Sequence, residues 1–68
     1  MNKFSENLKY VRAESGMTRM ELAKKLNVSV RLVAYWESGQ RECNFDMLIA
    51  IADIFSISVD WLLGRTDY

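Results

Sequence analysis

Apolar residues recur at helical spacing along most of this chain, and a glycine or a small polar residue follows each run. Phe4, Leu8 and Val11 stand at positions i, i+4 and i+7, which places them on one face of an α-helix. Because glycine commonly follows the last turn of a helix, the spacing predicts a first amphipathic helix from Phe4 to near Gly16.

A second helix is indicated by its capping residues. Thr18 is followed three residues later by Glu21, which is the pattern of a capping box. In this motif the hydroxyl accepts a hydrogen bond from the third backbone amide, and the glutamate accepts one from the amide of the capping residue. The helix is therefore expected from about Arg19 to Leu26. Its inner face is formed by Leu22, Ala23 and Leu26.

The connection to a third helix is very short. Asn27 tolerates a left-handed backbone conformation, and Ser29 can cap a helix that runs to about Ser38, before Gly39. About three residues then separate two short helices, and such a connection is typical of a helix-turn-helix.

Two more helices complete the predicted fold. Asn44 can cap a helix that ends near Phe55, and Ser58 can cap a short helix with Asp60 well placed in its first turn. The pattern predicts an all-α fold of five helices, with residues 1–68 forming a single domain. A domain of this size buries only about 60% of the surface that its unfolded chain exposes, so its stability is expected to be marginal without a partner.

The composition is that of a folded protein without a metal site. Half of the residues are hydrophobic and 26% are charged, while Cys43 is the only cysteine and histidine is absent. We therefore expect no disulfide within the chain, no zinc site and no cofactor. Residues 1–10 lack the apolar run of a signal peptide, and the longest apolar run, Met47–Ala52, is too short to cross a bilayer. These features predict a cytoplasmic protein that binds no membrane.

Charge is distributed unevenly, although the net charge is zero and the sequence pI is about 6.2. Residues 1–41 hold eight basic and four acidic side chains, a balance of +4, and residues 42–68 hold one basic and five acidic side chains, a balance of −4. A neutral balance by itself argues against a nucleic-acid partner. The asymmetry indicates that the two halves face different partners.

Three motifs carry a resemblance to a known family. They are "ELAKKLNVS", "WESGQR" and "SVDWLLG". From about Phe4 to Gly64 the chain resembles the Cro/repressor-type (XRE-like) helix-turn-helix proteins of phages and bacteria. The resemblance implies a compact five-helix bundle of the phage-repressor type. It also implies that the third helix lies in the major groove of double-stranded DNA, with the second helix against the backbone.

The resemblance also implies roles for single residues. Those implied to read bases are Val30, Arg31 and Tyr35. Those implied to hold the sugar-phosphate backbone are Thr18, Arg19, Ser29, Gln40 and Arg41. Side-chain chemistry agrees for two of them, because an arginine can bind guanine O6 and N7 together and a valine can pack on a thymine methyl group. The alternatives are a phosphate contact for Tyr35 and ordinary solvated side chains for the arginines.

Further positions concern the support of the third helix. The resemblance implies a partly buried ion pair between Arg12 and Glu37. Arg19 stands where the family most often has glutamine, so it would add a charge for a phosphate but lose the amide that braces the third helix. Cys43 stands where the family commonly has proline. We interpret Cys43 as a small hydrophobic residue, with a redox role as the alternative.

The fourth helix carries two apolar stripes. One faces inward in the family, and the second exceeds what a small core requires, so we expect it to lie in a homodimer interface. The second stripe is formed by Met47, Ala50 and Ile54. Val59 and Trp61 are assigned to the same interface, with closure of the protomer's own core as the alternative.

These observations predict a transcriptional regulator without enzymatic activity, most simply a repressor that binds a palindromic operator as a homodimer. One alternative is the DNA-binding antitoxin of a toxin–antitoxin pair, in which a partner protein binds the acidic half. Another is a protein-interaction module that kept the fold and lost DNA binding. An enzyme is disfavoured because the chain has no histidine and no paired acids at a plausible site.

Overall fold

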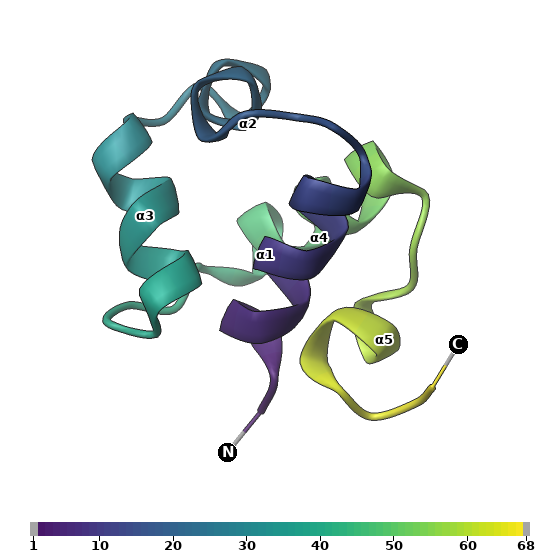
Figure 1. The fold of residues 1–68 in the computed structure, drawn as a ribbon. Coiled ribbons are helices and arrows are strands. Elements are labelled where there is room, and N and C mark those ends of the chain that lie inside the picture. Colours follow the sequence, from purple (N-terminus) through teal and green to yellow (C-terminus); the bar gives the residue numbers. More distant parts are fainter. Residues whose placement is uncertain (1, 68) are drawn as a thin grey trace.

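The computed structural model describes residues 2–67, which form five α-helices and no strand (Figure 1). The helices are α1 (Phe4–Glu14), α2 (Arg19–Leu26), α3 (Val30–Ser38), α4 (Phe45–Phe55) and α5 (Val59–Leu63). The predicted all-α fold and the order of its five helices are confirmed. The first helix ends slightly earlier than expected, at Glu14, and Gly16 then takes a left-handed conformation with φ of +71°.

Four of the helices begin at the capping residue that the sequence indicates. The side chains of these residues each accept a hydrogen bond from the third amide of the helix, and they are Thr18, Ser29, Asn44 and Ser58. The capping box of α2 is complete, because the Glu21 carboxylate also accepts from the Thr18 amide at 2.8 Å. A cap of this kind typically contributes about 1 kcal/mol, so the helix starts are defined locally.

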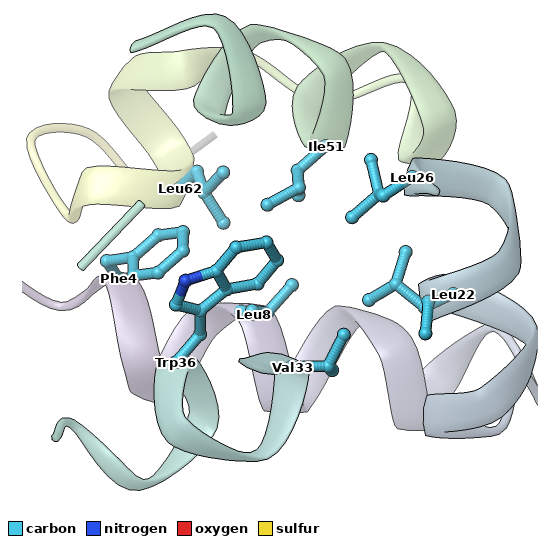
Figure 2. Close-up of a cluster of buried hydrophobic side chains, with 9 residues drawn as sticks. Phe4, Leu8, Leu22, Leu26, Val33, Trp36, Ile51 and Leu62 are labelled. Atoms are coloured by element: carbon cyan, nitrogen blue, oxygen red, sulfur yellow. The ribbon is translucent and has the colours of Figure 1, made fainter. Parts of the chain in front are cut away.

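A single cluster of buried apolar side chains holds the helices together, with Trp36 of α3 near its centre (Figure 2). Trp36 is 1% exposed, and its ring packs edge-to-face with the Phe4 ring of α1, with 6.5 Å between the ring centroids. α1 packs against α3 on one side and against α5 on the other (Figure 1). The face of α3 that holds Trp36 is therefore fixed to the core.

The second apolar stripe of α4 differs from expectation. Met47, Ala50 and Ile54 are partly buried and pack against the protomer's own core, so the prediction that the core does not require them is wrong. The reason is that α2 and α5 both pack against α4 and cover more of its circumference than a single inward face. The apolar side chains that remain uncovered on α4 are Phe45, 82% exposed, and Ile49, 53% exposed.

Residues of the C-terminal half also close the core. Trp61 packs against the buried cluster, and the centroid of its ring lies 6.3 Å from the centroid of the Tyr10 ring. Cys43 is partly buried against the same cluster, and this burial, with a smaller effect of Glu42, raises the pKa of its thiol. A thiol with a raised pKa carries little thiolate, which supports the interpretation of Cys43 as a small hydrophobic residue.

Among residues 2–67, no helix is long and apolar enough to cross a membrane. The same residues contain no cluster of side chains suited to binding a metal ion.

Candidate nucleic-acid interface

The turn between α2 and α3 has the geometry expected from its sequence. Asn27 takes a left-handed conformation with φ of 58° and ψ of 44°, and the next amide, that of Val28, donates to the Ala23 carbonyl at 3.0 Å. Val28 packs against the core, and the Ser29 hydroxyl accepts from the Leu32 amide at 3.1 Å. Three residues thus redirect the chain from one helix to the next, which confirms the predicted helix-turn-helix.

α3 has one buried face and one uncovered face. Val33 and Trp36 are almost completely buried, and Leu32 packs partly against the core. Arg31 is exposed, and Tyr35, four residues later on the same side of the helix, is partly exposed. Val30 at the start of the helix is 40% exposed. The three side chains predicted to read bases are therefore accessible while the helix itself is held in place.

The side chains predicted to hold the DNA backbone are also accessible. All five are exposed, and they are Thr18, Arg19, Ser29, Gln40 and Arg41. The loop after α3 folds back on the helix end, because the amides of Gln40 and Arg41 both donate to the Tyr35 carbonyl, at 3.0 and 3.3 Å. Ser29 and this loop therefore lie at opposite ends of α3.

A buried carboxylate fixes the C-terminal end of α3. The Glu37 side chain is 1% exposed and accepts hydrogen bonds from Arg12 Nε at 2.5 Å and from Arg12 Nη2 at 3.1 Å. Arg12 Nη1 donates to the Met17 carbonyl at 2.9 Å. The predicted ion pair between Arg12 and Glu37 is confirmed, and Arg12 connects α1 and the loop before α2 to α3.

Arg19 joins the same carboxylate. Its Nε donates to Glu37 Oε1 at 3.0 Å, so the side chain of the first residue of α2 reaches the end of α3. Arginine at this position has no side-chain amide, as expected, but Arg19 contacts α3 through Glu37 instead, a contact that the sequence did not predict. The sequence contains the two opposite charges but no spacing that would pair them, since they lie 18 residues apart on different helices.

The pKa of Glu37 reflects these neighbours. Burial is the largest single influence and acts to raise the pKa, but the hydrogen bonds and positive charges of Arg12 and Arg19 together outweigh it and hold the pKa below its ordinary value. Glu37 is therefore a carboxylate at neutral pH, with a charged partner on each of two other helices.

A helix-turn-helix with one helix anchored in the core and exposed basic and polar side chains on its outer face is the arrangement of a DNA-binding domain. Comparison with known families agrees, because the helix-turn-helix family model matches residues 8–62. The chain belongs to the helix-turn-helix family. This membership identifies residues 8–62 as a helix-turn-helix domain of the DNA-binding type.

Curated relatives are similar over almost the whole chain but are longer. The chain is 38% identical over 60 residues to the uncharacterized HTH-type transcriptional regulator YqaE of Bacillus subtilis, covering 88% of this chain and 52% of that protein. It is 36% identical over 62 residues to the HTH-type transcriptional activator BcrR of Enterococcus faecalis, covering 91% of this chain and 30% of that protein. The chain therefore spans about half the length of the first relative and less of the second.

A solved structure with a similar fold contains DNA. The P22 c2 repressor, crystallised in complex with a synthetic operator, superimposes with a TM-score of 0.85 and is 25% identical, covering 93% of this chain and 96% of that one. The fold similarity thus extends over nearly all of both chains.

Proposed function

We propose that the chain is the DNA-binding domain of a transcriptional regulator that inserts α3 into the major groove of an operator. The observation that carries this proposal is the division of α3: Val33 and Trp36 anchor it in the core, while Arg31 and Tyr35 stay accessible on its outer side. Rigid support on one face and free side chains on the other are what base readout in the major groove requires.

The uncovered side chains of α3 suit direct readout. Arg31 has no acidic residue three or four positions away along the chain to bind its guanidinium, and that guanidinium matches guanine O6 and N7. Val30 can pack on a thymine methyl group beside it. Tyr35 can donate to a base edge or to a phosphate. These residues would therefore prefer a half-site that contains one guanine and one neighbouring thymine.

Backbone contacts would come from both ends of α3 and from the start of α2. The Ser29 hydroxyl uses its oxygen as an acceptor in capping, which leaves its hydrogen available to donate to a phosphate, and Thr18 lies exposed at the start of α2. Gln40 and Arg41 follow the helix in an exposed loop. Because the net charge of the chain is zero, we expect non-specific affinity to be low.

We propose further that the protein binds a palindromic operator as a homodimer. One small recognition helix binds weakly, whereas two helices about 34 Å apart can read two half-sites one helical turn apart. The best candidates for the interface are the exposed Phe45 and Ile49 of α4, an addition to the interface that the sequence predicts. Five partly exposed residues belong to the predicted interface, and they are Met47, Ala50, Ile54, Val59 and Trp61.

Repression is the simplest mode of action, because a domain bound at a promoter blocks polymerase by occupying its site. The relatives are of both kinds, since BcrR is named an activator and P22 c2 a repressor. A reporter gene downstream of the selected operator would distinguish the two modes by the sign of its response. Such a role would place the protein in the cytoplasm, where bacterial and phage operators are found.

Selection of binding sites from random duplex DNA tests the proposal directly. We expect a two-fold symmetric site with one guanine of each half-site dependent on Arg31. The Arg31→Ala variant should bind this site about 1–3 kcal/mol more weakly and lose preference at that base pair, while its affinity for random duplex changes less. Failure to enrich any sequence, with intact folding, would refute sequence-specific binding and favour the protein-interaction alternative.

A further inference from the structure

The ion network around Glu37 contains more positive charge than its buried carboxylate can neutralise. Arg12 already binds both carboxylate oxygens, and only 14% of the Arg12 side chain is exposed. A buried carboxylate needs one charged partner, and Arg12 supplies it. Arg19 is therefore a second guanidinium, and it leaves one positive charge in excess in the network.

The Arg19 side chain is bonded to the protein through one nitrogen and is otherwise partly exposed to solvent. The hydrogen bond to Glu37 uses Nε, and 43% of the Arg19 side chain is exposed. The two terminal nitrogens carry four more N–H donors. Because a guanidinium is planar and rigid, holding one nitrogen fixes the direction of the others, and such a fork binds phosphate oxygens well.

We propose that Glu37 is a positioning residue for DNA binding: it holds Arg19 by Nε so that the terminal nitrogens are presented to a DNA phosphate beside the end of α3. This inference rests on the proposed function and deepens it. An arginine that is already held loses less side-chain freedom when it binds than a free one does. The same carboxylate belongs to α3, so the phosphate contact of α2 and the placement of the recognition helix are coupled through one group.

Lysine at position 19 separates this role from a simple charge effect. The lysine side chain ends in a single ammonium group, which keeps the charge but has no second nitrogen to share between Glu37 and a phosphate. Arg19→Gln removes the charge, and Arg65→Lys is the matched control. Arg65 follows α5, is exposed and forms no ion pair with an acidic side chain among residues 2–67, and no DNA contact is assigned to it, so lysine should replace it without loss.

The experiment measures affinity for a random-sequence duplex of about 20 base pairs over a range of salt concentrations, with helical content checked by circular dichroism. We expect Arg19→Lys and Arg19→Gln to bind roughly fivefold to tenfold more weakly per contact at 0.1 M salt, and Arg19→Gln to lower the slope of log K against log salt by about one unit. Arg65→Lys should match the wild-type affinity and slope. Both Arg19 variants keep the Arg12–Glu37 pair and should stay folded.

The outcomes are distinct. Wild-type affinity and slope in Arg19→Lys would overturn the inference, because a free charge would then suffice. An unchanged slope in Arg19→Gln would also overturn it, because Arg19 would then only support the fold. Absence of binding by the wild-type protein, even at low salt, would refute the proposed function itself and with it this inference.

Discussion

Neutralising Glu37 should destabilise the fold more than its position at a helix end suggests. The Glu37→Gln variant keeps the size of the side chain but leaves the largely buried Arg12 without a counter-charge. Breaking a buried pair by changing one partner typically costs about 3–5 kcal/mol. Arg19 is 43% exposed and can turn to solvent, so it adds little to this cost, and we expect a loss near the lower limit, about 3 kcal/mol.

A loss of this size is large for a chain of 68 residues, whose total stability is expected to be about 3–10 kcal/mol. It corresponds to a fall in Tm of about 12–24 °C, since 1 kcal/mol shifts the Tm of such a domain by about 4–8 °C. Thermal unfolding followed by circular dichroism measures this shift. The matched control is Glu21→Gln, because Glu21 is exposed and glutamine can also complete a capping box, so its loss should stay below about 1 kcal/mol.

The stability that Glu37 contributes to the fold should decrease as the pH falls. Arg12 and Arg19 hold the pKa of Glu37 below its ordinary value of 4.5, so the folded state binds its proton less readily than the unfolded state. The stability that the carboxylate contributes is therefore fully present above that ordinary value and is lost as the pH falls through the lower pKa of the folded state. The difference in Tm between wild type and Glu37→Gln should shrink between pH 7 and pH 3. A difference of equal size at both values would show that the charge of Glu37 is not its cause.

Three more variants or treatments test other parts of the structure. Arg41→Ala should weaken binding to operator and random duplex alike and lower the salt slope by about one unit per contact and protomer, whereas an unchanged slope would remove Arg41 from the interface. Phe45→Glu should give a folded protein that sediments as a monomer and binds its operator much more weakly. Phe45 is exposed, so this change should not disturb the fold, whereas Ile54→Glu could do so because Ile54 packs against the core. A monomeric wild type that binds its operator as a single copy would contradict the dimer proposal. Alkylation of Cys43 at neutral pH should be slower than that of a free thiol, since burial raises its pKa, and a rate equal to that of a small thiol would contradict its placement.

The helices and the turn were predictable because their signals are local. A capping side chain bonds to an amide three residues away, and the left-handed turn at Asn27 needs a residue that tolerates positive φ, so both can be identified without knowledge of the fold. One left-handed residue, Ser56, ends α4 without glycine or asparagine, and no local signal marks it.

Two features were decided by tertiary structure alone. Periodicity shows which residues of α4 share a face, but the packing of α2 and α5 determines which faces are covered, and this left Phe45 exposed and Ile54 partly buried. The pairing of Arg19 with Glu37 depends on where α2 meets the end of α3, and no spacing along the chain encodes that distance. Local hydrogen bonds and periodic faces are properties of short segments, whereas coverage of a face and contact between distant charges depend on how the segments pack.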